Sequence, residues 1–213
     1  EPNPVEGTDY HHVGFDIGLS AGRNYAIDRV TTEFTLLLDD DFVFSAETRL
    51  DLLLQPLDDG LDLAGGRVGG AEYHCRLLKA MDTLHYQFGR ERGFHEGWPL
   101  YDMTWNFFLA RTEKLRAVRW DPELKLAEHT DFFLRAMALP LLITHVPAVN
   151  IEHVREVNGD YKEYRERSSH CATKFFLKHG LTRSIKRNGR ESTLMRFVGH
   201  VEHLKKKGRL PNV

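Results

Sequence analysis

The sequence predicts an α/β protein in which helices flank a mainly parallel sheet. The first observation is the alternation of helical and strand-like segments between residues 19 and 70. The second is the uncharged run 34–38, which is followed at once by three acids, as at the carboxyl end of a buried strand. Ligands of such sheets bind beyond the carboxyl ends of the strands, so we expect the functional site at these acids.

Two helices and two strands are expected in the first third of the chain. The first helix covers residues 19–32 and has Ser20 as its cap. After the strand at 34–38, a second capped and amphipathic helix begins at Ser45. A second strand covers 61–70, and its glycines predict the close approach of another group.

The rest of the chain continues the alternation. The expected elements are, in order, a loop lining a cleft at 89–101, a buried strand at 105–111, a helix at 112–118, a helix from Glu128, strands at 141–146 and 149–151, and charged helices from about residue 160. The helical spacing after Glu128 makes Phe132, Leu134 and Met137 candidate core residues.

Length and charge limit the interpretation further. A chain of 213 residues is long enough for one sizeable core and short for two, so we expect one domain over 1–213. Residues 1–13 are typical of a linker, and residues 182–213 of a basic helical tail.

The 29 basic and 31 acidic residues nearly balance, and no basic signature indicates nucleic-acid binding. No apolar run approaches the roughly 20 residues of a membrane span.

The three acids Asp39, Asp40 and Asp41 are the strongest functional signal. Adjacent carboxylates repel one another and cost stability unless a cation lies among them. Their hard oxygen atoms suit Mg²⁺ or Mn²⁺, which keep water ligands and share their coordination shell with a substrate phosphate. The triplet alone leaves two interpretations open, a metal–diphosphate site and an acidic turn without a ligand.

Three features occur in a definite order: Ser20-Ala-Gly-Arg23-Asn24, the acids 39–41, and Glu128-His-Thr-Asp131-Phe-Phe-Leu-Arg135. Together they resemble inverting nucleotide-sugar glycosyltransferases of the GT-A fold. Segments 18–26 and 106–112 look most like the β-1,4-N-acetylgalactosaminyltransferases, of the family 2 or 12 type. The resemblance runs from about residue 14 to about 180. A GT-A domain normally opens with a strand, a helix and a strand, and we expect this chain to begin after them.

The resemblance implies an activity and a donor site. A sugar of the GalNAc, Gal or Glc type would pass from a UDP-sugar to a hydroxyl of a glycan, glycolipid or glycoprotein. Asp39 would face the ribose or uracil, Asp41 the Mn²⁺ or Mg²⁺ ion, and Asp40 would orient the turn. Arg23 would contact the nucleotide or diphosphate, where a guanidinium forks onto oxygens. An ordinary helix-surface arginine is the alternative.

A histidine completes the metal set that the resemblance implies. His153 falls where related galactosyltransferases place a second metal ligand, at the end of a late strand. A neutral imidazole suits Mn²⁺ better than Mg²⁺. His145 is a weaker competitor, and a structural role is the alternative for either residue.

The start of the fourth helix carries the candidate base. An inverting transfer needs a group that takes the proton of the acceptor hydroxyl. Glu128, Asp131 and Arg135 keep the family spacing, while His129 replaces the usual Asp. Residues three apart on a helix are neighbours, so we expect Asp131 as the base, Glu128 holding the acceptor and His129 as the rival. The alternative is two acids that merely favour a helix N-terminus.

Four further residues are candidates for sugar contacts. Asp102 and Asn106 lie in a segment that resembles the family's acceptor- and donor-sugar wall. Trp98 and Trp105 could stack on the apolar face of a sugar ring, although buried aromatic residues are more often part of a core.

Other interpretations remain open from the residues. A haloacid-dehalogenase-like phosphohydrolase would use Asp39 as nucleophile and Asp41 as acid/base, but the glycine expected soon afterwards is missing from 42–45. A non-catalytic sugar-binding domain is the third possibility.

The sequence also leaves open the role of the basic C-terminal residues and the cellular compartment of the protein. Solvated helix faces explain most basic runs, and attraction to an anionic membrane surface or partner is the alternative. The basic residues concerned are Lys186, Arg187, Arg190, Arg196, Lys205, Lys206, Lys207 and Arg209. The resemblance favours the Golgi lumen for a eukaryotic protein and the cytoplasm for a bacterial or viral one.

Overall fold

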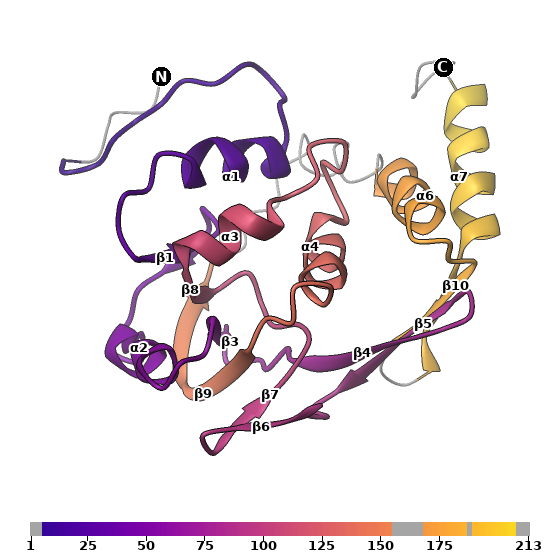
Figure 1. The fold of residues 1–213 in the computed structure, drawn as a ribbon. Coiled ribbons are helices and arrows are strands. Elements are labelled where there is room, and N and C mark those ends of the chain that lie inside the picture. Colours follow the sequence, from indigo (N-terminus) through magenta and orange to yellow (C-terminus); the bar gives the residue numbers. More distant parts are fainter. Residues whose placement is uncertain (1–5, 155–167, 187–188, 208–213) are drawn as a thin grey trace.

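The computed structural model describes residues 6–154, 168–186 and 189–207 (Figure 1). Its helices are α1 (Leu19–Ile27), α2 (Leu50–Asp58), α3 (Thr112–Val118), α4 (Glu128–Ala136), α6 (Ser168–Lys178) and α7 (Leu194–Lys206). Its strands are β1 (Phe34–Leu37), β2 (Phe42–Val43), β3 (Leu63–Val68), β4 (Cys75–Ala80), β5 (Thr83–Phe88), β6 (Gly93–His95), β7 (Trp98–Leu100), β8 (Phe108–Arg111), β9 (Ile143–His153), β10 (Arg183–Ile185) and β11 (Glu191–Thr193). Residues 6–13 are exposed and form neither helix nor strand.

The central sheet is mixed and has the strand order β1-β8-β3-β9-β2. Strand β3 is parallel to β9, whereas the neighbour pairs β1–β8, β3–β8 and β2–β9 are antiparallel. The α/β class is therefore confirmed, and the expectation of a mainly parallel sheet is wrong. In the described residues between β3 and β8 the chain forms the strands β4–β7 and no helix. A helical crossover, which would make β3 and β8 parallel, is therefore missing from this described stretch.

Alternate residues of β3 pack into two separate cores. Leu63 joins a core with residues of α3 and α4, and Ala64 joins a core with Leu53 and Leu57 of α2. This alternation follows from the period of two in a strand, and it covers both faces of the sheet with helices. The predicted close approach at the β3 glycines is confirmed, because a Cβ atom on Gly65 would lie 2.2 Å from Thr104 Oγ1.

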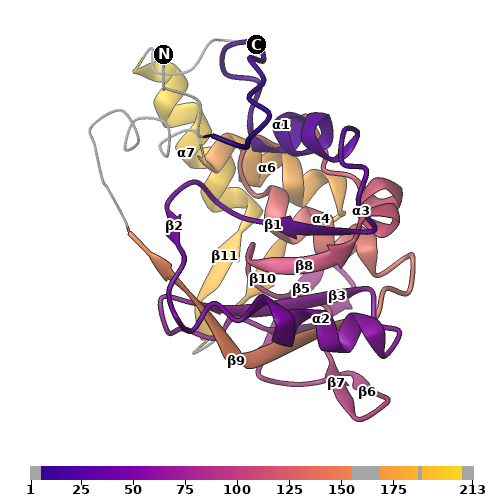
Figure 2. The same cartoon turned by 90° about the vertical axis from the view of Figure 1, so that its left-hand side faces the viewer.

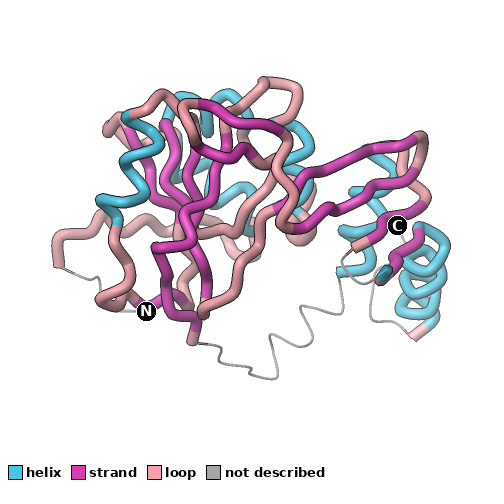
Figure 3. Tube along the Cα trace, turned by 90° about the horizontal axis from the view of Figure 1, so that it is seen from below, coloured by secondary structure: helices cyan, strands magenta, loops and turns pink. Residues whose placement is uncertain are grey.

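A second sheet, with the order β11-β10-β5-β4, joins the middle of the chain to its C-terminal part. Strands β4 and β5 extend away from the central sheet towards α6 and α7 (Figures 1 and 3). The region after residue 160 is therefore not helical throughout, since β10 pairs with β5 and β11 with β10. None of the described helices combines the length and apolar character that a membrane span needs.

Most of the described basic residues of the C-terminal run are exposed, namely Lys186, Arg190, Arg196, Lys206 and Lys207, and Lys205 is half-buried. Lys186 lies over the ring of Tyr86, 5.3 Å from its centroid, and burial lowers the pKa of this lysine. Arg187 and Arg209 lie outside the described residues. Lys186 thus makes a local aromatic contact, while most of the described run faces solvent.

Several predicted boundaries are wrong because tertiary contacts override local signals. Helix α1 ends at Ile27, and Ser20 lies inside it, where its hydroxyl donates to the Leu124 carbonyl at 2.7 Å. Helix α2 begins only at Leu50. Ser45 belongs to the preceding turn, in which its backbone N–H donates to Thr48 Oγ1 at 3.0 Å.

The middle of the chain also differs in detail. The expected loop at 89–101 contains the hairpin β6–β7, and the strand expected at 105–111 begins at Phe108. The two strand segments near residue 145 are one strand, β9, with an irregular register opposite residues 65–67. On α4, Phe132 is buried as predicted, but Met137 is 42% exposed and the buried neighbour is Phe133.

Candidate active site

The acids 39–41 form the turn between β1 and β2. Strand β2 is antiparallel to the end of β9 and pairs Phe42 with His153 (Figure 2). This pairing brings His153 Nε2 to 2.8 Å from Asp41 Oδ2. The side chains of Asp41 and His153 are 40% and 22% exposed, so a ligand in solvent can reach both. Asp40 is exposed in the same turn.

Arg23 of α1 connects this turn to the start of α4. Its guanidinium donates to Asp39 Oδ1 at 2.8 Å and to Glu128 Oε1 at 3.2 Å, and its side chain is 9% exposed. Burial raises the pKa of both carboxyl groups, and the positive charge of Arg23 opposes each rise. Asp39 and Glu128 thus share a single guanidinium, and the charge of Asp41 acts on Asp39, which leaves an excess of negative charge that suits a bound cation.

Asn106 and His129 form a pair beside this network. Nδ1 of His129 lies 2.5 Å from Oδ1 of Asn106, and a hydrogen bond from Asn106 also favours the charged form of Asp39. Nε2 of His129 is enclosed and has no hydrogen-bond partner among the described residues. Burial lowers the pKa of His129 to about 3, so its ring is neutral at physiological pH.

Asp131 lies in a different environment from Glu128, although both are on α4. It is fully buried and is in contact with Arg135 Nε at 2.8 Å, Lys178 Nζ at 2.7 Å and His179 Nε2 at 2.8 Å. Burial alone would raise the pKa of Asp131, but the hydrogen bonds from these three residues lower it to about 2. A group of this kind ties α4 to α6 and has little capacity to take up a proton at neutral pH.

Aromatic residues lie beside His129. The rings of Trp105 and Tyr73 lie 4.6 Å apart, and Tyr73 lies 6.0 Å from the ring of His129. The indole N–H of Trp105 donates to the Ala71 carbonyl at 3.0 Å. The half-buried Trp105 is thus held beside Tyr73 by a hydrogen bond that the sequence did not indicate, and its contact with a sugar stays a prediction.

Three predicted site residues have their contacts elsewhere. Trp98 donates to Asp59 Oδ2 at 2.8 Å, beyond the end of α2. Asp102 accepts from the Leu77 N–H at 2.8 Å, pairs with Arg92 at 3.2 Å and lines a separate cavity of 340 Å³. His145 stacks on His74, with ring centroids 4.4 Å apart. These contacts give Trp98 and Asp102 structural partners and place His145 in another cluster.

Sequence reasoning overlooked two residues near the site. Tyr73 stands in an irregular segment without a period, so nothing in its neighbourhood indicated that it packs on Trp105. His179 lies 48 positions from Asp131, and only the packing of α6 on α4 makes them neighbours. No local signal could have found either contact.

Comparison with known proteins agrees with the motif order. The family model for glycosyl transferase family 2 matches residues 10–119. Beta-1,4 N-acetylgalactosaminyltransferase 2 of Mus musculus is 40% identical over 68% of this chain and 30% of its own length. Beta-1,4 N-acetylgalactosaminyltransferase 1 of Homo sapiens is 41% identical over 63% of this chain and 28% of its own length. Residues 1–349 of S. aureus TarS give a TM-score of 0.44 at 16% identity, over 75% of this chain and 52% of that one.

The family model and the two N-acetylgalactosaminyltransferases confirm the family resemblance that the motifs indicated. The chain spans about 30% of the length of the curated relatives that it matches.

Proposed function

Because the chain belongs to glycosyl transferase family 2, we propose that it transfers a sugar of the GalNAc, Gal or Glc type from UDP to an acceptor hydroxyl, with inversion. The acceptor would be a glycan, a glycolipid or a glycoprotein. Family membership makes the protein a glycosyltransferase and displaces the phosphohydrolase alternative. The observation that carries the rest of the proposal is the contact of Asp41 with His153 beside the Arg23–Asp39–Glu128 network.

We assign residues 1–213 to one catalytic domain of GT-A type. The mixed sheet with helices on both faces supports this assignment. So does the position of the acids just beyond the end of β1, where an α/β sheet presents its ligands.

The donor would lie against the turn 39–41. Arg23 is already held by two carboxylates, so it can turn one N–H towards a diphosphate oxygen without losing its position. The raised pKa of Asp39 reflects a site that is partly closed to water, in which hydrogen bonds to a ribose or uracil are strengthened.

The side chains present fit a manganese ion better than magnesium. Asp41 offers a carboxylate oxygen and His153 an imidazole nitrogen, and this mixed oxygen and nitrogen set is typical of Mn²⁺. Such an ion, when bound, would neutralise the charge that develops on the diphosphate as the sugar leaves. Asp41 and His153 hold it in our assignment, with Asp39 on the nucleotide side.

We assign the base to Glu128 in place of Asp131. A catalytic base needs a pKa close to the working pH and access to the proton, and burial moves the pKa of Glu128 upward towards that range. Asp131 is instead enclosed by Arg135, Lys178 and His179, and its pKa is about 2. His129 is the rival base through its unpartnered Nε2, which carries a lone pair when Nδ1 donates to Asn106, but burial lowers its pKa to about 3, so it meets the pKa criterion less well than Glu128.

The acceptor would approach over Trp105. Tyr73 lies beside that ring, and Asn106 is the next residue in the chain and is bonded to His129, so the segment offers one polar group and two aromatic rings to a sugar.

A panel of nucleotide sugars tests the proposed donor. We expect the unfolding temperature to rise with one of UDP-GalNAc, UDP-Gal and UDP-Glc when Mn²⁺ is present, and to rise much less without it. A ligand at 100 times its Kd stabilises the native state by about 2.7 kcal/mol. UDP release measured with the same sugar would establish turnover. The absence of a shift with all three sugars, with and without Mn²⁺, would contradict the assignment of the donor.

The base assignment predicts a selective loss in Glu128→Gln. We expect kcat to fall by about 100-fold or more, because general-base catalysis contributes about 10²–10⁴-fold, while the thermal shift with donor and Mn²⁺ is kept. Glu123→Gln, a change at an exposed position nearby, is the matched control and should retain kcat. If Glu128→Gln is active and His129→Gln is not, the base is His129.

A further inference from the structure

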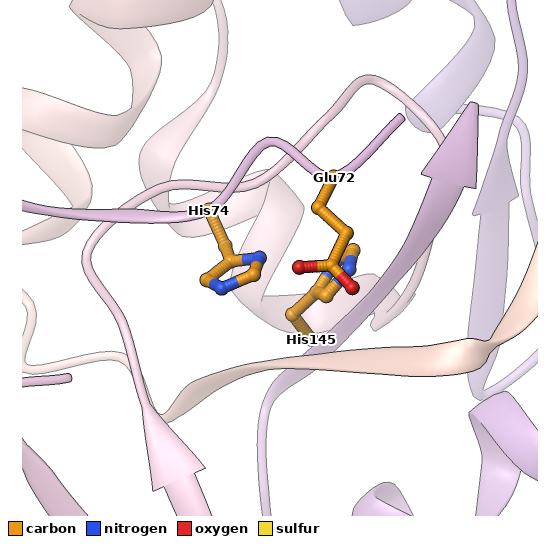
Figure 4. A group of neighbouring side chains, drawn as sticks. All are labelled: Glu72, His74 and His145. Carbon is orange, nitrogen blue, oxygen red and sulfur yellow. The ribbon is translucent and has the colours of Figure 1, made fainter. Parts of the chain in front are cut away.

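A second group of potential metal ligands lies away from the turn 39–41. Glu72 and His74 come from the segment before β4, and His145 comes from β9, as Figure 4 shows. One ligand atom from each side chain lies within 4.8 Å of the other two. The carboxylate of Glu72 points towards the two rings (Figure 4). Three donor atoms therefore converge from segments about 70 residues apart in the sequence.

Two ring nitrogens in this group are buried without a hydrogen bond. Nδ1 of His74 and Nε2 of His145 have no partner among the described residues, and the two residues are only 9% and 3% exposed. A buried polar atom without a partner costs stability, and such atoms in native proteins usually indicate a water or an ion. Nδ1 of His145 is already engaged by Thr104 Oγ1 at 3.4 Å, which leaves Nε2 as the free lone pair.

Both imidazoles are in the form that binds a metal. Burial lowers the pKa of His145 to about 3, and burial lowers the pKa of His74 despite the opposing charge of Glu72. A neutral imidazole needs no proton release before it coordinates. The charge of Arg67 acts against a cation here, but Arg67 pairs with Glu47 at 3.6 Å.

We propose that Glu72, His74 and His145 bind a Zn²⁺ ion at a site distinct from the donor site. Two imidazole nitrogens and one carboxylate are a common zinc set, with water in the fourth position. His145 pairs with Gly65 of β3 and Ile151 pairs with Val68, so His145 and His153 lie about five strand positions apart along the sheet, roughly 16 Å. Zinc at this site and Mn²⁺ beside His153 would therefore be separate ions.

The position of the cluster indicates what zinc would do. Tyr73 stands between two of the ligands, and successive side chains of an extended segment point to opposite faces. On the other face Tyr73 packs on Trp105 and lies near His129. The ion would fix this segment against β9 and so hold Tyr73 beside Trp105. A role for this contact in sugar binding rests on the proposed function, whereas zinc binding itself does not.

Calorimetry on the full 213-residue chain tests the site. After treatment with a chelator, titration with ZnCl₂ at neutral pH without nucleotide should give one tight site for each chain. Glu72→Gln should weaken the binding by about 10-fold or more, since it removes the charged ligand. Glu91→Gln changes an exposed carboxyl outside the cluster and should leave the Kd unchanged.

A variant at the other site separates the two proposals. Asp41→Asn should keep the zinc affinity, because Asp41 is not a ligand of this ion. Loss of tight zinc binding in Asp41→Asn, unchanged binding in Glu72→Gln, or no binding by the unmodified chain would each overturn the inference. Glu72 is exposed, so its substitution does not disturb a core. Failure of the sugar panel with tight zinc binding intact would contradict the proposed function alone.

Discussion

Replacement of Asp41 by Asn is expected to reduce sugar transfer by about 100-fold or more. The neutral amide is a poor metal ligand and leaves His153 without its carboxylate partner. The electrostatic contribution of a catalytic metal amounts to several kcal/mol, and about 2.7 kcal/mol corresponds to 100-fold in rate. The measurement is kcat/KM for UDP release as a function of Mn²⁺ concentration, in the variant and in the unchanged protein.

The structure offers a matched control for this loss. Asp51 is an exposed carboxylate on α2, away from the turn, and Asp51→Asn should keep both the activity and its dependence on Mn²⁺. The side chain of Asp41 is 40% exposed, so its replacement should leave the unfolding temperature nearly unchanged. Full activity of Asp41→Asn at low Mn²⁺ concentration would contradict the assignment of a metal site to the turn 39–41.

Replacement of Asp131 by Asn should cause the largest loss of stability. The change leaves Arg135, Lys178 and His179 around a buried position without a negative charge. Removing one partner of a buried ion network costs about 3–5 kcal/mol. Denaturant unfolding of the purified variant measures this cost, and the donor-induced thermal shift reports whether the folded fraction still binds.

The pH dependence of unfolding distinguishes this structural role from a catalytic one. The native pKa of Asp131, about 2, is below its ordinary value of 3.8, so its stabilisation is complete above pH 4 and is lost as the pH falls towards 2. The difference corresponds to about 2 kcal/mol. The unchanged protein should lose this contribution over that interval, and Asp131→Asn should lack this component of the acid dependence.

An exposed ion pair provides the comparison for Asp131. Asp28 pairs with Arg119 at 2.7 Å, and both side chains are more than 40% exposed. Exposed pairs contribute little to stability, so Asp28→Asn should change the unfolding midpoint far less. If Asp131→Asn is stable but has lost turnover, the structural role of Asp131 is contradicted and Asp131 is the base.

Local sequence predicted those parts of the site that lie next to regular elements. The uncharged run 34–38 predicted β1. The acids that follow it therefore had to lie just beyond the end of that strand. The spacing from Glu128 to Arg135 located α4, since an apolar stripe with charged residues between is typical of a helix packed on a core. The order of these motifs was sufficient to indicate the family.

Contacts between distant segments could not be predicted in the same way. Glu128 and Asp131 are both acids in the first turn of α4, and no local pattern separates their roles. One of them meets Arg23 of α1, and the other meets α6, because the helix presents them to different neighbours. The pKa of each group is set by those neighbours and by burial, and neither is a property of the local sequence.

The sequence by itself determined that this chain is an α/β protein of glycosyl transferase family 2, because the periodicity of its elements and the order of its polar motifs are local properties. The tertiary structure decided the direction of the strands, the meeting of Asp41 with His153 and the convergence of Glu72, His74 and His145. All three features depend on which strands become neighbours. The pairing of strands is set by the free energy of the whole core, and no single segment of the sequence encodes it.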